Sequence, residues 1–381
     1  MSHPKKILFL GFTPRGTGYF DVMEEEATYL KKLGYDVMIA FCDKNKKSDY
    51  QLHVDNRKIL VDRIPVLFKH PKADCTFDKL SNLQFNLYQD QIKRGVKRIV
   101  DDFNPDIIIC NHIWTISYEV SKLNIPYIIW GHGTDIARIQ NNDPAWKRFK
   151  TYADTALIGT KTVLFPSKAV QEKFLTTYPE YQNKSMVIHH GYDNKVFYPQ
   201  HICDNKPKLD QTQLVTVGAV DKSKGLHTII KAMKKLGNDY HLTWIGSSPN
   251  LEDIIAKDYP NITFIGQQPH QKVAEELRKS DIGILASEGA FEAFGLSALQ
   301  YTGCGLPIVL SDMPCFHEFT TDEFREFFTP GDVNGLVDKI KKMSSRLEKK
   351  DDQSTYFSYK KSCEFLWDNH NIKLLDIINN I

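Results

Sequence analysis

Short apolar segments alternate with amphipathic segments along nearly the whole chain, and the alternation occurs in two separate series. The apolar runs fit buried parallel strands, whereas the segments between them have the length and spacing of helices. A chain with this order folds into parallel sheets that are covered by helices on both faces. The sequence therefore predicts an α/β protein with two doubly wound, Rossmann-like domains.

Each series contains several strand candidates. In the first series we expect a helix at Tyr19–Leu33 and strands at Ile7–Gly11, Asp36–Phe41, Ile107–Cys110 and Tyr127–Trp130. In the second series the expected strands are Leu214–Gly218, Leu242–Gly246, Ile262–Gly266, Ile282–Leu285 and Pro307–Leu310, with helices from Leu226, at Gln271–Lys279 and from Ala293.

A polar stretch without periodicity, Tyr198–Gln213, separates the two series and is predicted to be a linker. The domains are therefore expected at residues 1–200 and 210–350. The last segment, residues 356–381, has apolar residues at helical spacing and must bury that face elsewhere in the chain. Doubly wound sheets bind ligands beyond the carboxyl ends of their strands, so we expect the site in a cleft between the two domains.

The composition excludes several classes of protein. The chain has 381 residues, of which 41% are hydrophobic and 25% charged, so it is not a disordered chain. Its net charge of +2 does not favour nucleic-acid binding. The seven cysteines are scattered and include no C-x-x-C pair, which argues against a disulfide framework or a zinc site. We find no signal peptide and no membrane-spanning run, and we expect a cytoplasmic protein.

Two glycine-containing loops follow strands of the first series. The segment G-F-T-P-R-G-T-G, Gly11 to Gly18, would let backbone N–H groups approach a phosphate at the start of a helix. The alternative is a flexible turn. The segment G-H-G-T-D, Gly131 to Asp135, places His132 between two glycines just past a strand, where a substrate would lie. The alternative here is a turn whose histidine caps a helix.

The most informative stretch is Ser287–Pro307, in which a strand, a short loop and a helix follow one another. If a helix begins at Ala293, the free N–H groups of its first turn would face an anion. Glu292 would lie directly before the first residue of that helix. The alternative for Glu292 is an ordinary acidic N-cap. Gln300 follows eight residues later, about 12 Å along a helix at 1.5 Å per residue, which suits a nucleotide-sugar.

These segments together resemble the retaining glycosyltransferases of family four, which have the GT-B fold, over nearly the whole chain. Glu292 matches the first member of the family's E-x7-E signature, and Gln300 replaces the second. The segment G-A-V-D-K-S-K-G, Gly218 to Gly225, resembles G-R-x-x-x-x-K-G, with Lys224 matching and Ala219 at the arginine position. Further similar segments are Phe165–Lys168, Val187–Pro199, Asn261–Gly266, Ser280–Ser287 and Gly331–Asp332.

The resemblance implies that the C-terminal half binds a nucleotide-sugar and the N-terminal half binds the acceptor. It also implies that the terminal helix, residues 356–381, crosses back onto the N-terminal domain. The residues implied as catalytic are His132, Glu292 and Lys224. The residues expected to bind the donor are Gly16, Thr17, Gly18, Gly218, Lys222, Gly246, Gln268, Ala293, Phe294, Gly295, Leu296 and Gln300.

The chemistry that the family performs assigns a role to each catalytic residue. Negative charge develops on the leaving diphosphate, where Lys224 and helix N–H groups would stabilise it. No D-x-D motif is present, so we expect no metal ion. Glu292 would hold sugar hydroxyls, and the acceptor would attack from the leaving-group face with retention. This route does not use the two-carboxylate geometry of glycosidases. His132 would position the donor sugar and the acceptor.

Two departures from the family pattern leave alternatives open. Ala219 removes a charge-assisted contact to phosphate, which Lys222 could replace, and Gln300 offers ribose an amide in place of a carboxylate. The main alternative is a catalytically degenerate GT-B subunit that binds a ligand or partner. A nicotinamide oxidoreductase is a third class, but the chain lacks G-x-G-x-x-G.

The acceptor has its candidate ligands in the N-terminal half. Arg15 and Asp135 are candidate acceptor ligands. The segment Gln89–Asp101 is basic and leaves a weak peripheral membrane contact open, although a solvated helix is the simpler reading. We expect a small polar or saccharide acceptor and, by resemblance, a UDP-linked hexose or N-acetylhexosamine as donor. The oligomeric state has no signal in the sequence.

Overall fold

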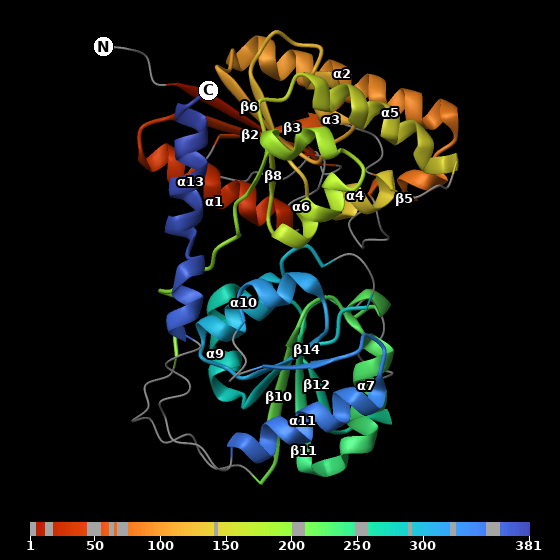
Figure 1. Cartoon of the computed structure of the whole chain (residues 1–381), viewed down its shortest axis with the longest axis vertical. Coiled ribbons are helices and arrows are strands. Elements are labelled where there is room, and N and C mark those ends of the chain that lie inside the picture. The colour runs from red at the N-terminus through yellow and green to blue at the C-terminus, as the bar shows by residue number, and fades with distance from the viewer. Residues whose placement is uncertain are drawn as a thin grey trace. The chain divides into compact units, whose positions relative to one another are not determined.

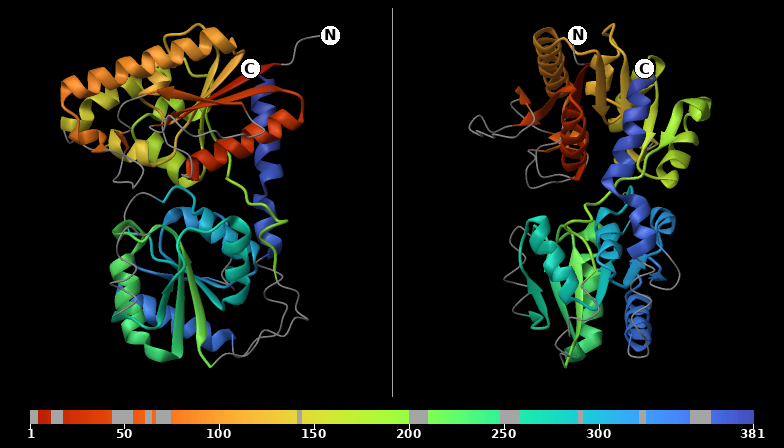
Figure 2. Two further views of the ribbon diagram at one scale, coloured as in Figure 1. Left: turned by 180° about the vertical axis from the view of Figure 1, so that it is seen from behind. Right: turned by 90° about the vertical axis from the view of Figure 1, so that its left-hand side faces the viewer.

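The computed structural model describes residues 5–11, 18–43, 55–60, 65–66, 75–140, 144–199, 210–247, 258–288, 292–320, 325–347 and 359–381. The chain divides into two compact units. The N-terminal unit comprises residues 1–189 and 371–381, and the C-terminal unit comprises residues 190–370. Figures 1 and 2 show that each unit contains a parallel sheet flanked by helices.

The sheet of the N-terminal unit has seven parallel strands in the order β3-β2-β1-β6-β7-β8-β9. Their bounds are β1 Lys6–Gly11, β2 Asp36–Asp43, β3 Asp55–Leu60, β6 Ile107–Asn111, β7 Tyr127–Trp130, β8 Val163–Phe165 and β9 Ser185–Val187. Two short strands, β4 Pro65–Val66 and β5 Cys75–Thr76, pair separately. The reversal of strand order between β1 and β6 is that of a Rossmann-like sheet.

In the part of the chain that the structure describes, helices accompany this sheet, and one returns to it from the last residues. They are α1 Gly18–Lys32, α2 Asn82–Phe103, α3 Ile116–Val120, α4 Thr134–Ile139, α5 Pro144–Ile158, α6 Lys168–Leu175 and α13 Trp367–Asn379. α1 and the C-terminal part of α13 pack on one face of the sheet (Figure 1), where Phe20 and Ile378 share a buried cluster with Ile7. α2 begins with a capping box in which Ser81 and Gln84 satisfy each other's backbone N–H groups.

The C-terminal unit repeats the same plan with six parallel strands in the order β12-β11-β10-β13-β14-β15. The strands are β10 Thr212–Val217, β11 Tyr240–Ile245, β12 Ile262–Phe264, β13 Ile282–Leu285, β14 Ile308–Ser311 and β15 Arg325–Phe328. The helices are α7 Leu226–Leu236, α9 His270–Lys279, α10 Leu296–Gly303 and α11 Val333–Leu347. α7 and α11 bury their apolar stripes on one face of this sheet, and the order again reverses, between β10 and β13.

The predicted fold class is confirmed, and most strands that the sequence indicated begin and end within two residues of the expected bounds. One helix start was wrong. The helix expected from Ala293 begins at Leu296, because Gly295 adopts a left-handed conformation with φ of 84° and ends the preceding loop. Gln300 therefore lies only four residues into that helix, and the helix does not span the distance from Glu292.

The division of the chain differs in detail from the expected domain limits. The units separate after His189, and most of the expected linker, residues 200–209, lies outside the described residues. Of the terminal segment, residues 371–381 belong to the N-terminal unit as the resemblance implied, whereas 359–370 belong to the C-terminal unit. The reason is a local anchor: Leu366 forms a bridge with Tyr192, whose hydroxyl lies 2.8 Å from Ser362 Oγ.

None of the helices that the structure describes is long and apolar enough to cross a membrane. Cys42, Cys110, Cys304, Cys315 and Cys363 carry free thiols. Burial raises the pKa of the Cys110 thiol to about 12, so this thiol is un-ionised at neutral pH.

Candidate active site

The carboxyl ends of β10 and β13 lie side by side where the strand order of the C-terminal unit reverses. Connections leave these two strands in opposite directions, which opens a crevice in sheets of this type. Two of the sequence motifs follow these strands, Gly218–Gly225 after β10 and Ser287–Gly295 after β13.

The loop after β10 is held in shape by its own residues. The Asp221 carboxylate accepts hydrogen bonds from the backbone N–H groups of Ser223 and Lys224, at 2.8 and 3.2 Å, and so caps a short 3-10 helix. Gly225 follows with φ of 75°, and a Cβ there would lie 2.1 Å from the carbonyl oxygen of Ala286. Only glycine permits this approach, which brings the β10 loop against the end of β13.

The two loops meet in a half-buried polar cluster. Lys224 Nζ lies 2.7 Å from Glu292 Oε2, and Ser287 Oγ donates to the same oxygen at 2.9 Å. Of the two charged side chains, Lys224 is 35% exposed and Glu292 13%. Burial disfavours the charged form of Lys224 and so lowers its pKa. The negative charge and the hydrogen bond of Glu292 have a larger effect in the opposite direction, so the pKa of Lys224 is raised. The lysine is therefore a fixed cation, and the carboxylate is held on one oxygen.

The start of α10 presents backbone groups to the same region. Gly295 is the N-cap, and a Cβ there would lie 2.3 Å from the Phe316 ring. The Phe294 side chain is buried against Phe319 and Phe365, so only its backbone is available to a ligand. Tyr301 anchors the helix, because its hydroxyl accepts from Val217 N at the end of β10.

The remaining donor candidates of this unit lie on neighbouring loops. Gly218 and Gly246 follow β10 and β11, and a Cβ on Gly246 would lie 1.9 Å from Gly218 O, so this pair permits close backbone approach. Lys222 is exposed on the short helix after β10. Gln268 donates to the carbonyl of Ile265 and is half-buried. The half-buried Gln300 forms no hydrogen bond with Glu292 or Lys224 in the described part of the chain.

In the N-terminal unit, His132 is fully buried at the end of β7. Its Nε2 lies 2.7 Å from Asn111 Oδ1, and its ring packs against Tyr19 and His112 at centroid distances of 4.2 and 4.9 Å. The structure thus places the His132 side chain just past β7, as the sequence indicated, at the centre of a buried aromatic and polar cluster.

Asn111, His112 and Tyr19 were missed by the sequence analysis. Asn111 ends β6, the strand beside β1 at the reversal of strand order, and His112 follows with φ of 81°, a rare value for a residue with a Cβ. Burial lowers the pKa of His112 to about 3, so its imidazole is neutral. The polar dipeptide Asn111-His112, directly after an apolar strand, was the signal that could have indicated these two residues; Tyr19 had no such signal.

Asp135 does not fit the role of an acceptor ligand. It is fully buried, and its carboxylate accepts from three backbone N–H groups, those of Ile113, His132 and Ile136, at 3.0–3.1 Å. Burial raises its pKa to about 6, although these hydrogen bonds lower it. Asp135 therefore shapes the two loops that carry His112 and His132.

The glycine loop after β1 is only partly described. Gly18 is the exposed first residue of α1, while Arg15, Gly16 and Thr17 lie outside the described residues. Within the parts of the chain that the structure describes, no three histidine, cysteine, aspartate or glutamate side chains gather as metal ligands.

Solved structures with this fold are numerous. A sucrose-phosphate synthase from Thermosynechococcus elongatus superposes with a TM-score of 0.79 at 16% identity, covering 99% of this chain and 98% of that one. The Anabaena protein HepE, solved with UDP and glucose, gives a TM-score of 0.76 at 16% identity, covering 99% and 100%. These likenesses show a GT-B fold.

Sequence comparison gives the family. Residues 199–359 match the model of the glycosyl transferases group 1, and residues 18–196 match that of glycosyltransferase family 4. The two matches cover both units and identify the chain as a GT-B glycosyltransferase of group 1. An uncharacterised glycosyltransferase of Methanocaldococcus jannaschii is 24% identical over 58% of this chain. The matched part spans 59% of the length of that curated relative.

Proposed function

We propose that the protein transfers a sugar from a nucleotide-sugar to an acceptor hydroxyl, with retention at the anomeric carbon and without a metal ion. The observation that carries this proposal is the convergence of Lys224 and Ser287 on one oxygen of Glu292 beside the start of α10. A fixed cation and a helix start suit the diphosphate of a donor, and a carboxylate suits sugar hydroxyls.

Each group has a separate role in the proposed reaction. As the bond from the anomeric carbon to the diphosphate breaks, Lys224 and the α10 N–H groups stabilise the charge on the leaving oxygen. Within the described residues the Glu292 carboxylate accepts hydrogen bonds on Oε2, and we propose that Oε1 accepts one from a sugar hydroxyl. The acceptor oxygen bonds to the anomeric carbon on the same face, and its proton passes to the departing diphosphate.

The N-terminal unit is proposed to bind the acceptor, a small polar molecule or a saccharide. His132 acts there by positioning: its ring is fixed by Asn111, and its backbone N–H by Asp135. For the donor we propose a UDP-linked hexose or N-acetylhexosamine. The complex of HepE with UDP and glucose supports this choice, since HepE shares the fold.

The proposal is tested with a panel of UDP-, GDP-, ADP- and dTDP-sugars. We expect one UDP-sugar to raise the Tm of the full chain and to be hydrolysed slowly to UDP without an acceptor. The Lys224→Gln variant should lose both effects, because a charge-assisted phosphate contact is absent. If a donor stabilises the chain but no product forms with any acceptor, the protein is a degenerate binding subunit. If no donor stabilises it, the donor site is assigned wrongly.

Donor hydrolysis should not require a divalent cation. Lys224 is a permanent cation at the diphosphate position, since its pKa is raised. The rate of nucleoside diphosphate release in excess EDTA is expected to stay within about twofold of the untreated rate. A strict requirement for added magnesium or manganese would contradict this diphosphate site.

Ser287 should matter through the orientation of Glu292. Hydrogen bonds to charged groups are worth about 1.5–3 kcal/mol, so Ser287→Ala is expected to lower kcat/KM by about tenfold to a hundredfold. Ser287→Thr keeps the hydroxyl and should retain most activity. Steady-state kinetics with both variants checks this, and equal losses in the two would show that the hydroxyl is not the important group.

A further inference from the structure

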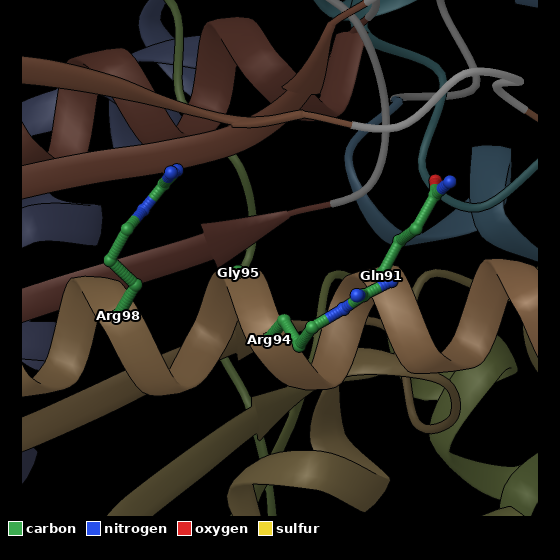
Figure 3. Close-up of a pocket in the computed structure, with 4 residues that line it drawn as sticks. All are labelled: Gln91, Arg94, Gly95 and Arg98. Carbon is green, nitrogen blue, oxygen red and sulfur yellow. The ribbon is translucent and has the colours of Figure 1, made fainter.

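A hollow of about 240 Å³ lies along the middle of α2, in the N-terminal unit. The described residues that line it are Gln91, Arg94, Gly95 and Arg98. Figure 3 shows them along one stretch of the helix, with the Gln91 and Arg98 side chains projecting to the same side and Arg94 extending toward Gln91. The spacing i, i+3, i+4, i+7 places all four on one helical face.

A glycine forms part of this face although it weakens the helix. Gly95 is buried in the interior of α2, where glycine is less favourable than alanine. Since glycine has no side chain, it leaves room between Arg94 and Arg98, which stand on either side of it along the face. The hollow is therefore flanked by two guanidinium groups.

The charges of the hollow are available to a ligand. Arg98 is exposed and has no ion pair within the part of the chain that the structure describes. Arg94 pairs with Asp90 at 2.9 Å, but both side chains are largely exposed, at 71% and 53%. Exposed pairs of this kind contribute little, so an anion can take the place of Asp90.

We propose that this hollow binds a phosphate group, carried either by a small soluble ester or by a phospholipid headgroup. A guanidinium group presents paired N–H donors that match two phosphate oxygens, and Arg94 and Arg98 both border the hollow. A volume of about 240 Å³ suits a phosphate and a small part of the molecule that carries it. The site is separate from the residues assigned above to sugar transfer.

The position of the hollow on α2 supports that separation. The helix face that carries Gln89 points toward α3, because the Gln89 amide donates to Thr115 O at 3.2 Å and to Glu119 at 2.8 Å. Gln91, Arg94 and Arg98 lie on a different face. Two exposed leucines, Leu83 and Leu87, lie on the arginine side of α2, one helical turn from each other. Their exposed fractions are 70% and 56%. Their apolar surface is the reason to test a lipid source beside a soluble one.

The test compares two double variants of the full chain that lose the same charge. Arg94→Gln/Arg98→Gln removes the two guanidinium groups, whereas Lys93→Gln/Lys97→Gln removes two exposed lysines from the neighbouring face of the same helix. Glutamine retains the helix propensity at all four positions. Both double variants are made in a Lys224→Gln background, and the Lys224→Gln protein itself is the reference. Binding of phosphate at the proposed donor site then does not contribute to the measured affinity.

Inorganic pyrophosphate is titrated by calorimetry, and vesicles of phosphatidylcholine with or without phosphatidic acid are tested by co-sedimentation. We expect the arginine variant to bind pyrophosphate or the phosphatidic acid vesicles at least about tenfold more weakly than the Lys224→Gln reference protein does. The affinity of the lysine variant should stay within about threefold of that reference. Loss in the pyrophosphate arm identifies a soluble ester, and loss confined to phosphatidic acid vesicles identifies a headgroup. The proposal is overturned if the reference binds neither probe, or if both variants lose binding equally.

Discussion

Replacing Glu292 by glutamine is expected to lower kcat/KM for sugar transfer by at least about a hundredfold, or roughly 2.7 kcal/mol of transition-state stabilisation. The substitution keeps the size of the side chain but removes its charge. Lys224, 2.7 Å away, then loses the partner that raises its pKa, and the sugar loses a carboxylate acceptor. Kinetics with the donor identified by the panel measures the loss.

A matched control lies four residues away in the same loop region. Glu288 Oε1 accepts a hydrogen bond from Thr228 Oγ1 at 2.5 Å, and within the described residues Glu288 forms no ion pair with Lys224. Glu288→Gln should therefore keep activity within a few-fold of wild type. A Glu292→Gln variant that is folded, as judged by circular dichroism and Tm, and as active as Glu288→Gln would show that Glu292 does not act on the substrate.

The second large effect concerns acid stability and His112. Its pKa is about 3 in the folded protein and near 6.5 when unfolded, so below pH 6.5 the unfolded chain binds a proton that the folded chain does not. Stability from this group is fully present above pH 6.5 and falls as the pH decreases toward 3. Between pH 7 and 4.5 the loss is roughly 2–3 kcal/mol, from 1.36 kcal/mol per pKa unit.

The effect is measured as a difference, because other groups titrate in the same range. Asp135, with a pKa of about 6, acts in the opposite direction: its protonation below pH 6 favours the folded state. His112→Asn removes only the histidine, and asparagine tolerates the φ of 81°. Urea unfolding at pH 7 and 4.5 should show the variant gaining roughly 2–3 kcal/mol relative to wild type on acidification. Parallel changes in the two proteins would contradict a neutral, buried His112.

The sequence predicted the fold and the places of the two loops that carry Lys224 and Glu292, because both depend on local patterns. Whether a segment is apolar or amphipathic can be recognised from a few consecutive residues, and the alternation of such segments indicated both sheets. Glycines beside Lys224 and Glu292 mark turns after strands, and strands of a parallel sheet end at one edge. The positions of these two residues at that edge could therefore be predicted without knowledge of any side-chain contact.

The contacts between side chains could not be predicted in this way, because they join residues that are distant in the chain. Lys224 and Glu292 are 68 residues apart, and their pairing with Ser287 requires β10 and β13 to be neighbours in the sheet. Asp135 resembled a ligand in the sequence, but burial turned its carboxylate onto three backbone N–H groups. A motif carries no information about burial, which is a property of everything that packs around it.

The start of α10 and the buried histidine cluster show the same division. The sequence by itself determined that a loop and a helix follow β13, and that a histidine lies between glycines after β7. Only the tertiary structure decided that the helix begins at Leu296, where Gly295 packs on Phe316, and that Asn111 holds the ring of His132. Propensity and periodicity act over one or two turns, whereas these contacts are selected by the close packing of segments brought together by the sheet.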